Sequence, residues 1–175
     1  MTGIFFGVWQ MIKELARKLA AFNLVDCVII EMTFRRGQFE SGAEILKNYS
    51  SMILLRASSS KAEVLVKMIR PRQEIKPALG SRIQSSEKIW RIFTASEILK
   101  FVEAVGDKNK IYQLNPPIVP AFLILETFCA EFPSDFIKLK FKNFITAGEP
   151  LSLQSVENKF ELSSAGVRKI LITAD

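Results

Sequence analysis

The feature that most constrains the fold is an internal repeat of a helix followed by antiparallel strands. The segment IIEMTF at 29–34 aligns with FIKLKF at 136–141, and a mostly apolar helix is expected before each of them. Each segment is followed by a turn containing glycine, Gly42 or Gly148, and then by two further expected strands. One such helix cannot cover its own sheet, so two copies are expected to pack together. The sequence therefore predicts an α+β fold made of two related halves.

The two halves differ in length, and a linker separates them. Residues 1–70 form the expected N-terminal half, and residues 88–175 form the C-terminal half. The stretch 71–87 contains prolines, a glycine and few large apolar side chains, which is typical of a linker. The first half has no counterpart of 88–115, so we expect it to lack one strand and a polar loop. This leaves open whether a second copy of the chain covers an exposed sheet edge.

Hydrophobic periodicity predicts the individual elements. The expected helix at 4–22 places Trp9, Ile12, Ala16, Leu19 and Phe22 on one face. Thr94 and Glu97 fit a capping box that opens a second helix with Ile98, Leu99, Phe101, Val102 and Val105 on its apolar side, and Gly106 is placed to end it. A third, almost wholly apolar helix carries Glu126. The expected strands lie around 26–35, 43–55, 62–70, 88–93, 135–142, 150–162 and 167–173.

Composition excludes several classes of function. The 175 residues include no histidine, so every mechanism that needs an imidazole base or ligand is excluded. The net charge of +6 suits an acidic partner or its phosphates, but no nucleic-acid motif is present, so nucleic acid is not expected as a partner. No metal-ligand spacing is present, and no metal or cofactor is predicted. Cys27 and Cys129 each lie in an apolar run and are expected to be buried free thiols, as in a reducing compartment.

The N-terminus is not expected to be a signal peptide, because Lys13, Glu14, Arg17 and Lys18 interrupt its apolar part. No other stretch is long and apolar enough to span a bilayer. A cytoplasmic protein is therefore predicted.

Residues 93–130 carry two motifs in one register. FTASEILKFVEAVGDKNKIY resembles a segment of MaoC-like hydratases, in which FT opens a helix and a G-D-x-N-P-I-H loop follows. Gly106, Asp107, Asn109 and Ile111 match that loop, Lys110 replaces its proline and Tyr112 replaces its histidine. YQLNPPIVPAFLILETFCA resembles the H-F-P-G-x-P-x-x-P-G-x-L-x-x-E signature of FabZ-type 3-hydroxyacyl-ACP dehydratases. Pro117, Pro120, Leu123 and Glu126 match it, Ala121 replaces a glycine, and Tyr112 again replaces the histidine.

The resemblance implies a double hot-dog fold, with two long helices wrapped by a curved antiparallel sheet. It implies an acyl thioester of coenzyme A or acyl carrier protein as ligand, and addition or removal of water at the acyl β-carbon as the reaction. Asp107 and Glu126 match acid/base positions of the two families, and Tyr112 would orient the substrate. Asn109, Pro120, Ala121 and Phe122 are the expected substrate-binding residues. Lys138, Lys140 and Lys142 are expected to face water, and they could also contact an acidic carrier protein.

Two alternatives stay open at this point. Because histidine is absent, the chain could be a non-catalytic acyl-binding protein or the partner of an active homologue, in a hetero-complex or as a homodimer. It could also be a hot-dog thioesterase, which can use a carboxylate with water and needs no histidine.

Overall fold

The computed structural model describes residues 2–73, 75 and 88–175, with side chains from residue 7 onward. The described elements, in chain order, are α1 (Thr2–Ala20), β1 (Val28–Arg36), β2 (Gly42–Asn48), β3 (Met52–Ser59), β4 (Ala62–Ile69), β5 (Ile89–Ile92), α2 (Ala95–Val105), the 3₁₀ turn η1 (Lys110–Gln113), α3 (Ala121–Glu131), β6 (Phe136–Phe141), β7 (Pro150–Val156), β8 (Lys159–Ser164) and β9 (Val167–Ala174).

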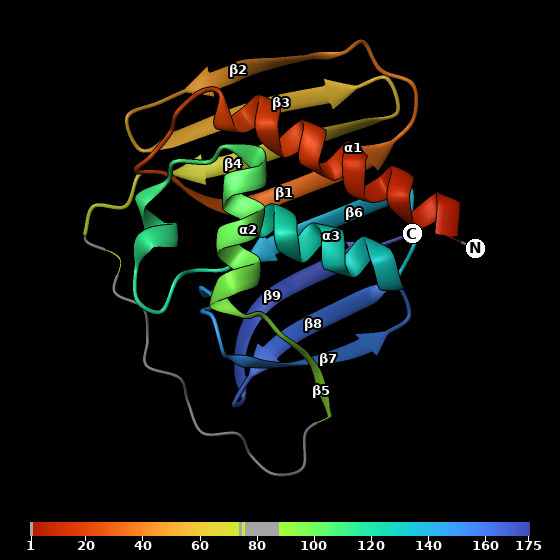
Figure 1. Ribbon diagram of the computed structural model, residues 1–175, viewed down its shortest axis with the longest axis vertical. Helices are drawn as coiled ribbons and strands as arrows, with labels where there is room; N and C mark the ends of the chain where they lie inside the picture. Colours follow the sequence, from red (N-terminus) through yellow and green to blue (C-terminus); the bar gives the residue numbers. More distant parts are fainter. Residues whose placement is uncertain (1, 74, 76–87) are drawn as a thin grey trace.

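All the described strands form one antiparallel sheet in the order β2-β3-β4-β1-β6-β9-β8-β7-β5. The two aligned segments lie at its centre, where β1 pairs antiparallel with β6 and Glu31 is opposite Lys140. On one side of this pair the order is β4-β3-β2, and on the other it is β9-β8-β7. The two halves are therefore related by an approximate two-fold arrangement. The short strand β5 lies outside β7, and no described strand lies outside β2 (Figure 1).

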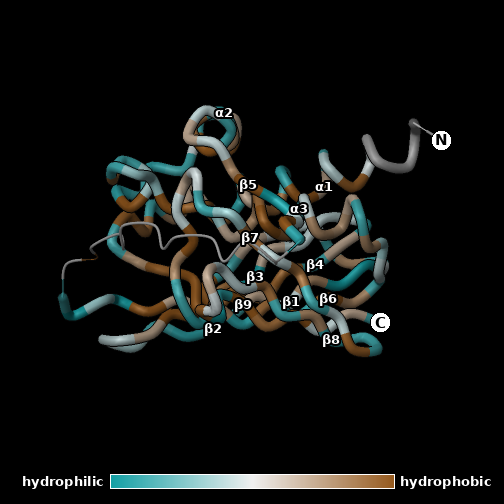
Figure 2. Tube along the Cα trace, turned by 90° about the horizontal axis from the view of Figure 1, so that it is seen from below, coloured by the Kyte–Doolittle hydropathy of each residue, from teal (hydrophilic) through white to brown (hydrophobic). Residues whose placement is uncertain are grey.

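The helices lie on one side of the sheet (Figure 2). α3 is the most enclosed helix, and its buried residues are Ala121, Phe122, Leu123, Ile124, Leu125, Phe128 and Cys129. α1 packs against α3 and against β3, and α2 packs on α1 (Figure 1). The core between helices and sheet includes Phe34 and Phe128, both fully buried. Both cysteines are free and buried, as predicted.

Local sequence explains how the elements begin and alternate. The residues of β4 alternate strictly between buried and half-buried, because every second side chain faces the helices. The Thr94 hydroxyl accepts the backbone N–H of Glu97, and the Glu97 carboxylate accepts the N–H of Thr94, so the predicted capping box is confirmed. Gly106 ends α2 with a φ of 71°, which a residue with a Cβ rarely adopts.

Two of the predicted strands are wrong, because each is a hairpin of two strands. The stretch 43–55 contains β2 and β3, separated by a turn around Tyr49–Ser51, and 150–162 contains β7 and β8, separated by Glu157 and Asn158. Glu157 has a φ of 57°, as expected in a tight turn. Each half therefore adds three strands after its central strand, where two were predicted. Both turns are only two or three residues long and contain neither glycine nor proline, so the sequence gives no strong turn signal.

Smaller differences concern helix ends and exposure. α1 ends at Ala20, two residues before the predicted end. Trp9 is 40% exposed and Leu99 is 52% exposed, although both were expected on apolar faces. Most of the predicted linker, 71–87, lies outside the described residues, so the half boundaries stay a prediction. In the part of the chain that the structure describes, no helix is long and apolar enough to cross a bilayer.

Candidate functional site

A cavity of about 290 Å³ lies between the helices and the first half of the sheet. Its walls come from the last turns of α1, the start of β1 and the facing parts of β3 and β4. The segment that runs from the end of α2 to the start of α3, and residues 141–145 at and after the end of β6, complete them. The lining side chains are mostly apolar; they include Ala16, Leu19, Leu55, Val66, Met68, Phe101, Val105, Val119, Phe122 and Ile124. We call this space the apolar cavity.

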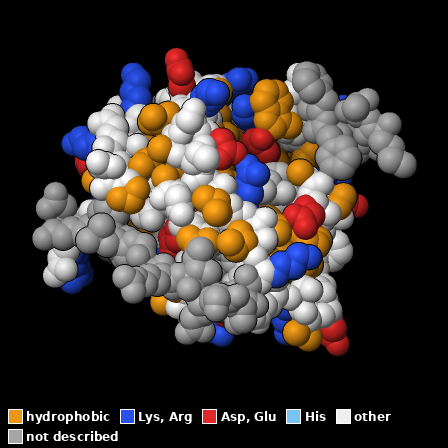
Figure 3. All heavy atoms as spheres, turned by 60° about the horizontal axis from the view of Figure 1, so that its bottom comes forward, with side chains coloured by type: hydrophobic (Ala, Val, Ile, Leu, Met, Phe, Trp, Pro, Cys, Tyr) orange, Lys and Arg blue, Asp and Glu red, His pale blue; other side chains and the backbone are white. Residues whose placement is uncertain are grey.

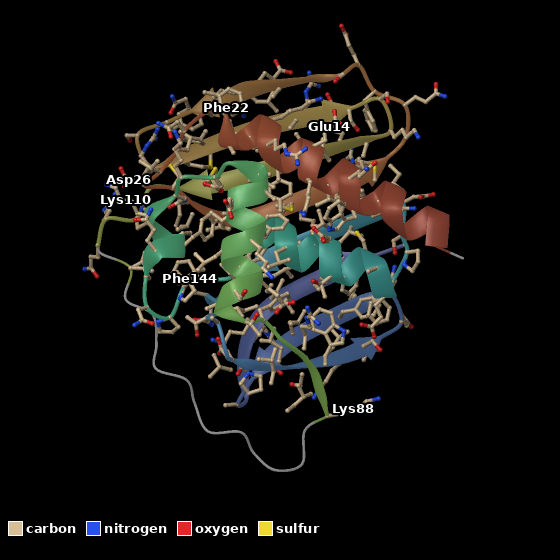
Figure 4. All side chains as sticks on the ribbon, in the orientation of Figure 1. Glu14, Phe22, Asp26, Lys88, Lys110 and Phe144 are labelled. Atoms are coloured by element: carbon tan, nitrogen blue, oxygen red, sulfur yellow. The ribbon has the colours of Figure 1, made fainter. Side chains whose placement is uncertain are left out.

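The apolar cavity has an enclosed end and an open end. Leu55, Val66 and Ile124 at its inner end are almost fully buried. At the outer end the lining includes exposed residues, among them Lys108 and Phe144. Phe144 is labelled in Figure 4, as are Asp26 and Lys110, which lie side by side where the loop after α2 meets the segment before β1. A ligand with an apolar part and a polar end would fit this shape.

The loop after α2 is fixed by side-chain to backbone hydrogen bonds. The Asp107 carboxylate accepts the backbone N–H of Asn109 at 2.9 Å. The amide of Asn109 donates to the Cys27 carbonyl at 2.6 Å, and its oxygen accepts the N–H of Ile111. Asn109 is buried, and its bond to Cys27 joins this loop of the second half to the residue just before β1 of the first half. We therefore regard Asn109 as a positioning residue for Asp107.

Asp107 and Tyr112 come together at the wall of the apolar cavity. The Tyr112 hydroxyl hydrogen-bonds to the Asp107 carboxylate. Burial raises the pKa of Asp107, and the hydrogen bonds from Asn109 and Tyr112 oppose that rise. Burial, together with the neighbouring Asp107 charge, raises the pKa of Tyr112 well above its usual value. Tyr112 is therefore a neutral hydrogen-bond donor, and Asp107 is a carboxylate that binds a proton more readily than usual.

The N-terminus of α3 meets the same cavity. Pro120 is its N-cap and makes no side-chain capping bond. The backbone N–H groups of Ala121 and Phe122 have no partner among the described residues, and both residues line the cavity. Ala121 has helical backbone geometry and no positive φ, so the glycine of the related motif is not required at this position. Free N–H groups at a helix N-terminus favour developing negative charge on a ligand oxygen.

Glu126 lies elsewhere. It is not among the residues that line the apolar cavity, and it faces α1, where it accepts a hydrogen bond from Trp9 and lies within electrostatic reach of Lys13. Burial raises the pKa of Glu126 to about 7, and its Oε2 atom is buried without a hydrogen-bond partner. The Lys13 amine lies 3.6 Å from the centre of the Trp9 ring. The position of Glu126 therefore differs from our expectation that Glu126 would share a site with Asp107.

Of the predicted site residues, six line one cavity: Asp107, Asn109, Tyr112, Pro120, Ala121 and Phe122. Sequence reasoning missed the contribution of the first half, because Ala16 and Leu19 were expected only as a helix face and 43–55 and 62–70 only as strands. It also missed the contact of Glu126 with α1. Among the residues described, no group of histidine, cysteine, aspartate or glutamate could hold a metal ion.

Charge is not concentrated on the face shown in Figure 3. Acidic and basic side chains are interspersed there with hydrophobic ones. The +6 net charge therefore does not produce a single large basic patch on that face.

Comparison with solved structures finds similar folds at low sequence identity. HtdX from Mycobacterium tuberculosis has a TM-score of 0.64 and 12% identity, and the match covers 97% of this chain and 92% of that chain. A MaoC-like dehydratase from Phytophthora capsici has a TM-score of 0.52 and 10% identity, covering 87% of this chain and 73% of that one. An acyl-ACP thioesterase from Bacteroides thetaiotaomicron has a TM-score of 0.50 and 12% identity, covering 85% of this chain and 75% of that one.

No protein-family model matches the sequence, and comparison with curated proteins gives no match. At identities this low, the similarity to these structures shows the fold of the protein and not its function. Together with the sheet order and the helices on one of its sides, they show that the protein has the predicted α+β, double hot-dog fold.

Proposed function

We propose that the protein binds an acyl thioester and adds water to it, or removes water from it, between the α- and β-carbons. The observation that carries this proposal is the meeting of Asp107, Tyr112 and the free N–H groups of α3 at the wall of the apolar cavity. Two of the similar structures, a MaoC-like dehydratase and an acyl-ACP thioesterase, bear names that refer to dehydration and to an acyl thioester, which supports the same class of ligand.

In this proposal the acyl chain occupies the apolar cavity and the thioester lies at the start of α3. The aliphatic tail would contact Leu55, Val66 and Ile124, where burial of apolar surface favours binding. The thioester carbonyl oxygen would accept hydrogen bonds from the N–H groups of Ala121 and Phe122. These donors would hold the oxygen more strongly as it gains charge in the enolate.

Asp107 is the proposed acid/base group. In hydration, the oxygen of a water molecule bonds to the β-carbon while the carboxylate of Asp107 takes a proton from that water. The electron pair of the carbon–carbon double bond moves into the enolate, and the protonated Asp107 then returns its proton to the α-carbon. Dehydration is the reverse. The rise of the Asp107 pKa through burial favours this role, since a general base works best when its pKa approaches the working pH.

Tyr112 supports Asp107 and does not replace the missing histidine. Its buried phenol stays protonated near neutral pH, so it can donate a hydrogen bond but cannot act as a base. Without a second positioned acid/base group, the rate is expected to be lower than that of an enzyme with a complete pair by about 10²–10⁴-fold.

The test uses crotonyl-CoA and a medium-chain 3-hydroxyacyl-CoA with the purified chain. We expect slow interconversion of enoyl and 3-hydroxyacyl thioesters, followed by chromatography, and a loss of at least about a hundredfold in Asp107→Asn. Asp135→Asn makes the same chemical change at an exposed site, and it should keep full activity. No turnover by the wild type with either substrate would contradict the catalytic proposal.

Two observations favour other functions, and the same purified protein can be used to test both of them. The Tyr112–Asp107 hydrogen bond satisfies the carboxylate internally, which favours a binding protein without turnover. Native mass spectrometry that detects a bound acyl thioester, with no product formed, would indicate that function. The similarity to an acyl-ACP thioesterase favours hydrolysis, and release of free thiol would identify it.

A further inference from the structure

The outer edge of β2 is an unpaired strand edge. β2 is the first strand of the sheet order, and all seven of its residues, Gly42–Asn48, are exposed. At the opposite end of the sheet, β7 occupies the equivalent position, and there β5 pairs with it. No described strand plays the part of β5 for β2, and Figure 1 shows β2 as the last strand on its side. Unpaired N–H and C=O groups along such an edge can pair with a strand from another chain.

Exposed hydrophobic side chains accompany this edge. Ile45 is 41% exposed, Leu46 is 40% exposed, and Tyr49, just after the strand, is 54% exposed. Large apolar side chains gathered on a free edge are unusual for a surface that faces only water. A strand from another chain that paired with β2 would cover them.

A β-bulge at Leu46 determines which side chains share a face. In the pairing of β2 with β3, Glu44 is opposite Arg56 and Ile45 is opposite Leu55, but the next pair is Lys47 with Leu54. Leu46 is thus the extra residue. Arg56 and Leu54 are two residues apart on β3 and lie on the same face of the sheet. Glu44 and Lys47 therefore lie on one face, whereas in a regular strand their three-residue separation would place them on opposite faces.

This arrangement makes β2 complementary to itself. When two copies pair antiparallel about the bulge, Glu44 of one copy is opposite Lys47 of the other, and the same contact occurs a second time by symmetry. In that register Ile45 is opposite Leu46 of the second copy. Gly42 is opposite Tyr49, and nothing lies within 4 Å of the position where a Cβ of Gly42 would be, so the ring has room. Without the bulge, residues 44 and 47 could not be opposite each other on one face.

We propose that β2 pairs with β2 of a second copy of this chain, in an antiparallel, two-fold symmetric dimer that continues the sheet. The contacts that specify it are two Glu44–Lys47 pairs on one face and two Ile45–Leu46 pairs on the other. Opposite charges directly across a strand pair are favourable and like charges are unfavourable, so the charges determine the register. Lys47 makes no ion pair with any described residue of its own chain, whereas Glu44 pairs with Arg56 of β3. In the dimer each Glu44 carboxylate would therefore lie between Arg56 of its own chain and Lys47 of the second copy.

Sedimentation velocity over a range of concentrations tests the dimer. We expect the wild type to be dimeric at micromolar concentration. Lys47→Glu places two glutamates opposite each other twice, and it should weaken dimerisation by at least about tenfold. Glu44→Lys also places two lysines opposite each other and should weaken it at least as much, but it removes the Glu44–Arg56 pair within the chain as well, so Lys47→Glu is the cleaner of the two variants. Lys159→Glu makes the Lys47 change on another exposed strand residue, and it should leave the dimer unchanged.

Mixing the two variants gives the decisive result. Glu44→Lys chains carry lysine at both positions and Lys47→Glu chains carry glutamate at both, so the register predicts a mixed dimer that native mass spectrometry can resolve. As a measurement that needs no variant, amide hydrogen exchange of residues 42–48 in the wild type should slow as concentration rises. A monomeric wild type at about 100 μM, a dimer indifferent to Lys47→Glu, or variants that fail to form the mixed dimer would overturn the proposal.

Discussion

Replacing Glu126 by glutamine should change how the stability of the protein depends on pH. The carboxyl faces α1 away from the apolar cavity, and burial raises its pKa from the ordinary 4.5 to about 7. Because the folded protein holds this proton more tightly than the unfolded chain does, stability is greatest below about pH 4.5. It falls as pH rises towards about 7 and then stays level. Glutamine removes this dependence, and its amide oxygen can still accept the hydrogen bond from Trp9.

The size of the effect follows from the two pKa values. A change from 4.5 to about 7 corresponds to about 3 kcal/mol at most. Glu126 is only partly buried, so solvent screening reduces the expected value to about 1–2 kcal/mol. Glu126→Gln should therefore be more stable than the wild type by about 1–2 kcal/mol at about pH 8, and little changed at about pH 4.5.

Urea denaturation at these two pH values measures the difference. Glu103→Gln, an exposed carboxylate on α2, is the matched control and should show no such pH-dependent gain. If Glu126→Gln were destabilising by the same amount at both pH values, the carboxyl would be a structural hydrogen-bonding group and the reasoning from its burial would be wrong.

Three further predictions concern the fold and the cavity. Lys169 is buried and pairs with buried Glu149 at 2.6 Å, so Lys169→Met should lower the free energy of unfolding by about 3–5 kcal/mol in urea titrations, and a cost below about 1 kcal/mol would contradict it. Thr94→Ala removes the capping box of α2 and should cost about 1 kcal/mol, whereas Ser96→Ala inside the helix should not. Ala16→Leu adds a larger side chain inside the apolar cavity. Binding of a medium-chain acyl-CoA, measured by calorimetry, should weaken at least about tenfold, while binding of crotonyl-CoA changes little. Equal weakening of both would show that the acyl tail does not reach Ala16.

The sequence predicted the elements of the fold where local rules decide them. The capping box at Thr94 and the end of α2 at Gly106 depend on a few neighbouring residues, and both were confirmed. In β6 the expected inward residues Ile137 and Leu139 are buried, but Lys138 is half-buried and pairs with Glu31. The hairpins at Tyr49–Ser51 and Glu157–Asn158 were missed, because a short polar turn inside an alternating run leaves the pattern almost unchanged. The bulge at Leu46 was missed because one extra residue changes the pairing of β2 with β3 and leaves no signal in the local sequence.

The candidate site was only partly accessible from the sequence. The segment 107–122 could be recognised because its residues are close in the chain. Its tie to the first half, the hydrogen bond from Asn109 to the Cys27 carbonyl, joins residues 82 positions apart. Likewise, nothing in the sequence shows which face of α3 carries Glu126, because apolar side chains surround the whole helix. Such contacts are set by packing between elements and have no local signal.

The most direct measurement of the central claim is a crystal structure of the protein with a non-hydrolysable thioether analogue of an acyl-CoA. We predict the alkyl tail between α1 and the sheet, in contact with Leu55 and Val66. The carbonyl oxygen should lie within hydrogen-bonding distance of the Ala121 and Phe122 N–H groups, and the β-carbon should lie beside Asp107. An alkyl tail bound anywhere else, with the apolar cavity empty, would contradict the proposed function.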